Sequence, residues 1–210
     1  GDICVHNCQG ACKRNELNGT PLSVCRLKRA AAVRDTGDWK ANVRHEPLSG
    51  KTVAVVGAGP AGLTAALYCA EKGHKVVVFE ANEKVGGQMR YGIPAYRLPD
   101  ATVDAEVATI LEIAQGNDAE PRIELRCGER VAEPQALLAQ GFDAVLVAVG
   151  THDGTVLPMP GHDLEGVLRN TDFLKAARTG NAPDLTGKRV VVLGGGNVAY
   201  DCARTAVRLG

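Results

Sequence analysis

The segment Lys51–Glu80 constrains the fold of this chain more than any other stretch. It reads KTVAVVGAGPAGLTAALYCAEKGHKVVVFE, in which two short runs rich in valine flank a run of helix-forming residues. Residues 52–56 and 75–79 are typical of buried parallel strands, and residues 61–72 are typical of a helix. Because adjacent parallel strands need such a crossover, the segment predicts a βαβ unit of an α/β fold.

Glycines separate the first predicted strand from the helix. Gly57, Gly59 and Gly62 have the spacing G-x-G-x-x-G, which permits a tight turn, close approach of backbone N–H groups to a pyrophosphate, and close packing of helix on strand. The helix N-terminus offers unpaired N–H groups and the positive end of its dipole to phosphates. Glu80 ends the second strand, where a carboxylate accepts hydrogen bonds from a ribose diol. The pattern predicts a dinucleotide site; the alternative is a tight turn without a ligand.

The composition excludes several other functions. The chain has 210 residues, 45% of them hydrophobic and 23% charged, which is ordinary for one or two globular domains. Its 24 basic and 24 acidic residues balance, so we expect no attraction to nucleic acid. No apolar run reaches transmembrane length and no signal peptide is recognisable, so we expect a cytoplasmic protein without membrane insertion. The ends of the sequence suggest a fragment of a longer polypeptide, or else a processed or split subunit.

Four of the seven cysteines fall within the first 25 residues. Cys4, Cys8 and Cys12 recur at every fourth position, and Cys25 follows. Thiolates this close repel one another unless a cation neutralises them, which favours an iron–sulfur cluster. Zinc is one alternative, although structural zinc sites usually pair their ligands. Disulfides or free thiols are the other.

The segment after Glu80 predicts a loop over a bound cofactor. Gly86 and Gly87 permit close approach of a bulky ligand to the backbone. Residues 91–99 contain one glycine and two prolines and are too interrupted for a regular element. Within this loop Arg97 is the charged residue best placed to reach a pyrophosphate; the alternative is an ordinary surface arginine.

The remaining patterns complete an α/β domain and begin another. The expected elements are a helix over 100–114, a strand over 122–127, a short helix over 133–140, a strand over 142–150 and a short helix over 170–178. The segment Lys188–Gly210 then repeats the first motif, with a strand over 189–193, the pattern G-x-G-x-x-A from Gly194 to Ala199, and a helix. We therefore expect a second phosphate-binding turn, whose pattern does not distinguish NAD from NADP. The expected domains are 1–49, a helical Cys-rich module and linker, 50–186, and 187–210.

Three stretches carry a resemblance to a known family. GGQMRYGIPAYRLP, FDAVLVAVGTH and GGGNVAYDCARTAVRLG, behind a Cys-rich N-terminus, resemble the glutamate synthase small-subunit family of FAD-dependent NAD(P)H oxidoreductases. Relatives of that family include the flavin modules of dihydropyrimidine dehydrogenase, electron-bifurcating transhydrogenase and formate-dehydrogenase-associated subunits. The resemblance covers nearly the whole chain.

The resemblance implies an α/β flavoprotein with two dinucleotide-binding domains. These are a Rossmann-like FAD domain and the start of a Rossmann-like NAD(P) domain, behind a small helical iron–sulfur module. The residues implied to bind FAD are Ile3, Gly57, Ala58, Gly59, Pro60, Ala61, Glu80, Gly86, Gly87, Gln88, Arg97, Val131 and Gly150. Those implied to bind NAD(P)H are Gly195, Gly196, Asn197 and Val198. The implied ligands of a [4Fe-4S] cluster are Cys4, Cys8, Cys12 and Cys25; because family members often hold two interleaved clusters, Cys12 could serve another one.

The implied function is electron transfer from NAD(P)H through FAD and the cluster toward a partner subunit of a larger redox complex. Hydride transfer to a flavin requires no catalytic side chain of the protein. A disulfide reductase would need a C-x-x-C pair beside the flavin, and the sequence contains none; Cys69, Cys127 and Cys202 stand singly and are interpreted as core residues. The other alternative is a non-catalytic subunit that holds FAD or docks a partner.

Overall fold

The structure, a computed structural model, describes residues 3–210. The chain forms two compact units, of which the first ends at Val43 and the second runs from Arg44 to Gly210. No helix within residues 3–210 is long and apolar enough to cross a membrane.

The first unit is helical and has little core. Its elements are α1 (Asn7–Gly10), α2 (Arg14–Asn18), α3 (Val24–Val33) and the 3-10 helix η1 (Asp38–Asn42). Among residues 3–43, Cys25 on α3 is the only buried residue. Large apolar side chains such as Leu17 and Leu27 are exposed, so little apolar burial stabilises this unit.

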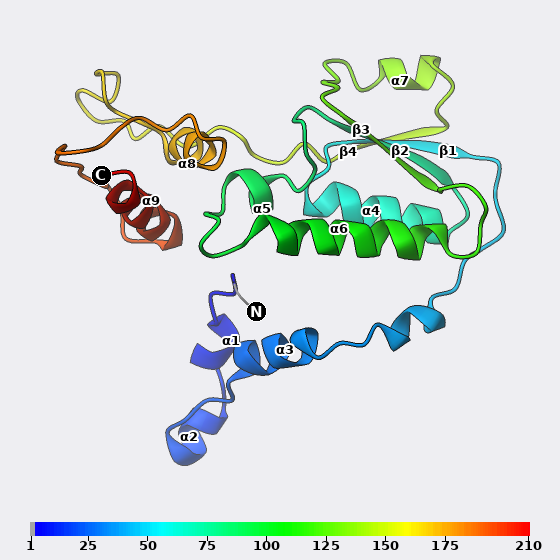
Figure 1. Ribbon diagram of the computed structural model, residues 1–210, viewed down its shortest axis with the longest axis horizontal. Coiled ribbons are helices and arrows are strands. Elements are labelled where there is room, and N and C mark those ends of the chain that lie inside the picture. Colours follow the sequence, from blue (N-terminus) through cyan, green and yellow to red (C-terminus); the bar gives the residue numbers. More distant parts are fainter. Residues whose placement is uncertain (1–2) are drawn as a thin grey trace. The chain divides into compact units, whose positions relative to one another are not determined.

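A four-stranded parallel sheet forms the centre of the second unit. Its strands are β1 (Thr52–Val56), β2 (Lys75–Glu80), β3 (Ile123–Cys127) and β4 (Ala144–Val147). They lie in the order β3-β2-β1-β4, and Val55 of β1 pairs with Val78 of β2 and Leu146 of β4 (Figure 1). This arrangement confirms the parallel α/β fold predicted from the first glycine motif.

Helices cover both faces of the sheet. The helices α4 (Pro60–Glu71) and α6 (Asp100–Gln115) lie on one face, and the short α7 (Ala136–Ala139) lies on the other (Figure 1). Strand side chains alternate between the two faces: Val55 lies against α4, whereas Ala54 and Val56 share a core cluster with Leu137 of α7. The central strands β1 and β2 are therefore buried from both sides, as their valine-rich sequences predict, whereas the edge strand β4 is largely exposed.

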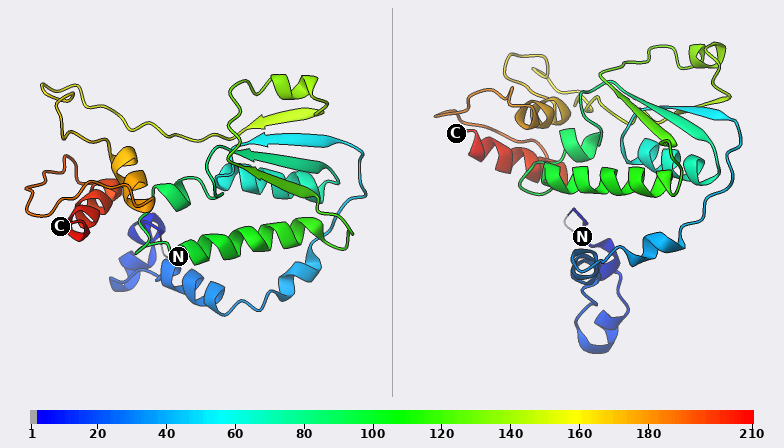
Figure 2. Two further views of the ribbon diagram at one scale, coloured as in Figure 1. Left: turned by 45° about the horizontal axis from the view of Figure 1, so that its top comes forward. Right: turned by 45° about the vertical axis from the view of Figure 1, so that its right-hand side comes forward.

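Three further helices lie beyond the carboxyl ends of the strands. They are α5 (Gln88–Tyr91), α8 (Asn170–Arg178) and α9 (Asn197–Arg208). Helices α8 and α9 lie close together and share a small core of their own (Figure 2). Its buried members are Phe173, Leu174, Cys202 and Ala206.

One predicted strand is absent and two predicted elements are shorter. The strand expected over residues 142–150 spans 144–147, and the helix expected over 133–140 spans 136–139. The strand expected over 189–193 is wrong, because residues 3–210 supply no neighbouring strand to pair with it. A strand is stabilised by hydrogen bonds to its neighbours, and Val191 is accordingly 81% exposed.

Candidate dinucleotide site

The first glycine turn joins the carboxyl end of β1 to the N-terminus of α4. Gly57 has φ +106°, in the region that favours glycine, and a Cβ there would lie 2.8 Å from the carbonyl carbon of Ala148. A Cβ on Gly62 would collide with the carbonyl oxygen of Gly57. The motif thus has the close packing of turn, strand and helix that its spacing predicts.

The N-terminus of α4 lies at the carboxyl end of β1 and has no side-chain cap. Gly59 is its N-cap residue and carries no side chain that could cap the helix, and Pro60 occupies the first turn. The first N–H groups of an α-helix have no partner within the helix. They therefore remain available to an anion, together with the positive end of the helix dipole.

A second pair of glycines lies against the first turn. The N–H of Gly86 donates to the carbonyl oxygen of Ala58 at 2.8 Å. A Cβ on Gly87, which has φ +53°, would lie 2.8 Å from Cα of Gly59. Only glycine fits at position 87, where the two backbone segments pass so close together. Because neither Gly59 nor Gly87 has a side chain, no side chain of these two residues covers the backbone on this side of the turn.

Glu80 lies at the end of β2, beside the glycine turn. It is 5% exposed, and its Oε2 accepts a hydrogen bond from the N–H of Ala58 at 2.9 Å. Its Oε1 accepts from both the backbone N–H and the side-chain Nδ2 of Asn82, at 2.9 and 2.6 Å. A buried carboxylate needs such partners, and here they fix its position next to the turn.

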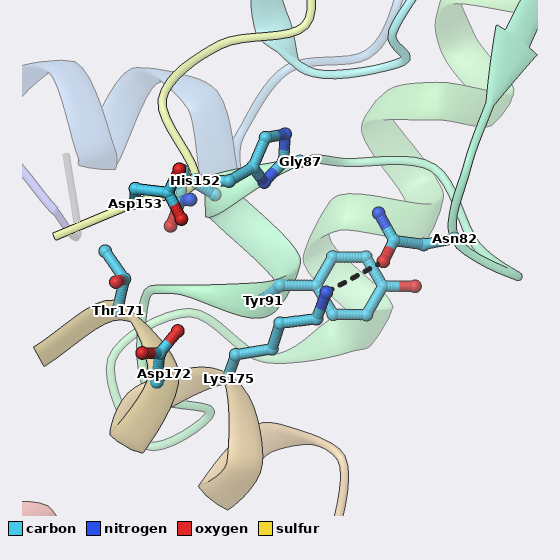
Figure 3. A pocket seen from close by; sticks show the side chains of 9 residues that line it. Asn82, Gly87, Tyr91, His152, Asp153, Thr171, Asp172 and Lys175 are labelled. Atoms are coloured by element: carbon cyan, nitrogen blue, oxygen red, sulfur yellow. Dashed lines mark hydrogen bonds between the residues drawn. The ribbon is translucent and has the colours of Figure 1, made fainter. Parts of the chain in front are cut away.

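A cavity of about 220 Å³ opens beside Gly87 and Gln88. Figure 3 shows that Asn82, Tyr91, His152 and Lys175 surround it, together with Asp153, Thr171 and Asp172. The side chain of Gln88 donates to the carbonyl oxygen of Thr151 at 3.0 Å, which ties α5 to the loop after β4. The Thr171 hydroxyl is buried without a hydrogen-bond partner in residues 3–210, so the cavity wall retains an unpaired polar group.

The second glycine turn forms without its strand. Gly194 has φ +122°, and Gly196 is the N-cap of α9. Apart from the adjoining residues of the chain, no atom within residues 3–210 lies within 4 Å of a Cβ built on Gly195 or Gly196. The helix α9 thus presents an open, uncapped N-terminus like that of α4, with Asn197 and Val198 in its first turn.

Comparison with known proteins identifies the family. A family model described as pyridine nucleotide-disulphide oxidoreductase matches residues 51–210. The chain belongs to the pyridine nucleotide-disulphide oxidoreductase family.

Relatives at the sequence level confirm the resemblance to the glutamate synthase small-subunit family. The chain is 36% identical over 234 residues to the NADP(+)-dependent formate dehydrogenase subunit beta of Moorella thermoacetica, covering 100% of this chain and 32% of that protein. It is 34% identical over 226 residues to the NADPH glutamate synthase small chain of Escherichia coli K12, covering 100% of this chain and 46% of that protein. The chain therefore spans less than half the length of these relatives.

A solved structure shares the fold. FprA from Mycobacterium tuberculosis, in complex with NADPH, matches with a TM-score of 0.62 and 29% sequence identity over 76% of this chain and 36% of that one. The chain is similar to a member of a Rossmann-like flavoprotein fold, which agrees with the parallel sheet and its glycine turn.

Two residues of this chain that are expected to contact the cofactor have partners within the protein. Arg97, expected at the pyrophosphate, instead donates to Asp201 of α9 at 2.6 Å, and the two side chains are 24% and 10% exposed. Val131, expected beside the adenine, packs against the core cluster that contains Phe79 and Leu137. In this structure both side chains are engaged in packing or pairing within the protein, so a role toward the cofactor stays a prediction.

The predicted iron–sulfur ligands do not come together. Cys4 and Cys8 are exposed, Cys12 is partly exposed and Cys25 is buried. Within residues 3–210, no three Cys, His, Asp or Glu side chains are arranged to hold a metal ion. Hydrogen bonds from the backbone of Leu22 and Arg14 lower the pKa of the Cys12 thiol, which favours the thiolate form that binds metals. Binding of a cluster by these cysteines therefore stays a prediction. Ile3, expected near the flavin, lies in a turn of the same unit.

The other cysteines are not arranged for disulfide chemistry. Cys202 is buried and Cys69 is partly buried, and burial raises the pKa of both thiols. The interpretation of Cys127 as a core residue was wrong, because it lies exposed at the end of the edge strand β3. These 210 residues contain no C-x-x-C pair.

The sequence patterns missed Asn82 and Lys175. Asn82 is adjacent in sequence to the predicted site but belongs to no motif, and Lys175 lies 93 residues further along the chain. The local sequence offers no signal for Asn82 beyond its place two residues after Glu80. Nothing in the local sequence of α8 indicates that Lys175 reaches this site.

Proposed function

We propose that the protein containing this chain is an NAD(P)H-dependent flavoprotein oxidoreductase, and that residues 50–186 hold FAD. The observation that carries this proposal is the bare backbone formed by Gly59 and Gly87 at the open N-terminus of α4. Glu80 lies next to it with its carboxylate buried and oriented. These residues fit a dinucleotide: the helix end matches the pyrophosphate, and the carboxylate matches a ribose.

The second turn supports a nicotinamide nucleotide. We propose that residues 187–210 begin its domain, with Gly195, Gly196, Asn197 and Val198 at the pyrophosphate. The open N-terminus of α9 supports this assignment, as does the NADPH bound to the similar structure of FprA. A bound flavin would supply the chemistry that converts a hydride, which carries two electrons, into single electrons. The protein would bind and orient the two nucleotides.

We further propose that the Cys-rich segment binds a [4Fe-4S] cluster and that the protein passes electrons to a partner subunit. This part rests on the spacing of Cys4, Cys8, Cys12 and Cys25 and on the names of the relatives, which are subunits of larger enzymes. Iron and acid-labile sulfide measured on the whole protein test it. Cys4→Ala should lose both, whereas equal iron in this variant would exclude Cys4 as a ligand.

The central experiment is anaerobic reduction of the full-length protein by NADPH and by NADH. Bleaching of the flavin absorbance with either nucleotide supports the oxidoreductase. If FAD is bound but neither nucleotide bleaches it, the non-catalytic alternative applies, in which the subunit only holds FAD or docks a partner.

A further inference from the structure

A chain of hydrogen bonds joins helix α8 to the glycine turn. Lys175 Nζ donates to Oδ1 of Asn82 at 3.2 Å, as Figure 3 shows. Nδ2 of Asn82 then donates to Oε1 of Glu80 at 2.6 Å, and Oε2 of Glu80 accepts from the N–H of Ala58 at 2.9 Å. These bonds connect α8 to the carboxylate of Glu80, although Lys175 and Asn82 are 93 residues apart in sequence.

Asn82 determines which acceptor of Glu80 remains available. An ionised carboxylate has about four acceptor positions on its two oxygens. Asn82 fills two of them on Oε1, and Ala58 fills one on Oε2. The remaining position is on Oε2, next to the turn, where a ribose hydroxyl can donate to it.

Lys175 determines which way the amide of Asn82 faces. An ammonium group only donates hydrogen bonds, so it requires the amide oxygen on its own side and directs the NH₂ toward Glu80. With the amide turned over, its oxygen would face the carboxylate and repel it. Lys175 also lies 5.7 Å from the ring centre of Tyr91, a cation–π contact that holds the ammonium group in place.

We propose that Asn82 and Lys175 are positioning residues for the ribose of the bound dinucleotide, so that the placement of α8 controls the affinity of this site. The inference rests on the proposed FAD site and deepens it. It assigns a role to two side chains that lie outside the glycine motif and reach the ligand only through Glu80.

The test measures FAD affinity in the full-length protein by reconstituting the flavin-free form and following the quenching of flavin fluorescence. Lys175→Met should weaken FAD binding by about threefold to tenfold, the effect of a lost hydrogen bond to a polar network. Lys175→Arg keeps a cationic donor and should restore affinity to within about twofold. Lys72→Met, at the exposed end of α4, is the matched control and should bind as the wild type does.

A double-mutant cycle separates the positioning role from a general loss of structure. Asn82→Ala should weaken FAD binding by about tenfold, and in that background Lys175→Met should have almost no further effect. If Asn82→Ala does not fold, Asn82→Ser replaces it, because the short hydroxyl can still bond within the local turn but cannot link Lys175 to Glu80. Equal losses from Lys175→Met in both backgrounds, or wild-type affinity in Lys175→Met alone, would overturn the proposal.

Glu80→Ala distinguishes the failure of this inference from failure of the proposed function. If Glu80→Ala binds FAD as tightly as the wild type, the assignment of Glu80 to the ribose fails and the positioning role fails with it. If Glu80→Ala weakens binding while Lys175→Met does not, the cofactor site stands and only the role of Lys175 is refuted.

Discussion

The contact between Gly59 and Gly87 allows protein stability and cofactor binding to be tested separately. Gly87→Ala would place a Cβ 2.8 Å from Cα of Gly59, against backbone that cannot turn aside. Gly87 also has φ +53° and ψ −135°, a conformation that strains a residue with a side chain. Backbone strain of about 1–3 kcal/mol and overpacking of about 1–3 kcal/mol add, so we expect the free energy of unfolding to fall by about 2–6 kcal/mol.

Gly59→Ala addresses the same contact from the other side, with a different expected result. Gly59 has φ −76° and ψ −177°, which any residue adopts, and a Cβ there would lie 3.8 Å from Cα of Gly87, an ordinary contact distance. Replacing an N-cap glycine with alanine should cost less than about 1 kcal/mol of stability. The new methyl group nevertheless occupies the bare backbone that a pyrophosphate approaches, so FAD affinity should fall by more than about tenfold.

Urea denaturation of the flavin-free protein and FAD titration of the folded protein measure the two quantities independently. The reasoning requires that Gly87→Ala lose stability and that Gly59→Ala lose FAD with near-normal stability. It is refuted if Gly59→Ala binds FAD as the wild type does, or if Gly87→Ala unfolds at the wild-type urea concentration.

Two further predictions concern ion pairs. Arg97→Ala should lower the free energy of unfolding by about 2–3 kcal/mol, because it leaves the buried carboxylate of Asp201 unpaired; a change under about 0.5 kcal/mol in urea denaturation would contradict this. Lys51, followed by the backbone of Thr52, holds the pKa of Asp143 below its usual value near 4. Because its pKa is lowered in the folded protein, Asp143 contributes stability above its ordinary pKa, and this contribution is lost as the pH falls through the lowered pKa. Asp143→Asn should therefore flatten the acid side of a curve of stability against pH. An unchanged curve would refute the pairing.

Much of the fold could be predicted from sequence because its signals are local. The strands β1 and β2 and the turn at Gly57 lie within one run of 30 residues, and their periodicity and spacing are sufficient to define a βαβ unit. Helix α8 was predicted at its observed limits, Asn170–Arg178. The parallel pairing of β1 with β2 follows from the crossover helix that links them.

The side-chain partners of the site could not be predicted, because they lie far apart in sequence. Arg97 and Asp201 are separated by 104 residues, and Asn82 and Lys175 by 93. Spacing rules apply to neighbours on one helix or strand and say nothing of such pairs. The charge of Arg97 and its place in a loop are visible in the sequence, whereas its partner Asp201 on α9 is not.

The two glycine motifs show which parts of a strand–turn–helix unit the local sequence determines. A helix satisfies its backbone hydrogen bonds within itself, whereas a strand needs a neighbour. Both turns and both helices therefore form, at Gly57 with α4 and at Gly194 with α9, but only β1 has strands on either side. The turn and helix of the second motif are thus encoded locally, and its strand should form only when residues 189–193 gain a paired neighbour. Hydrogen exchange in a longer chain that contains the remaining part of this domain would test this, since the amides of 189–193 should become protected there and stay unprotected here.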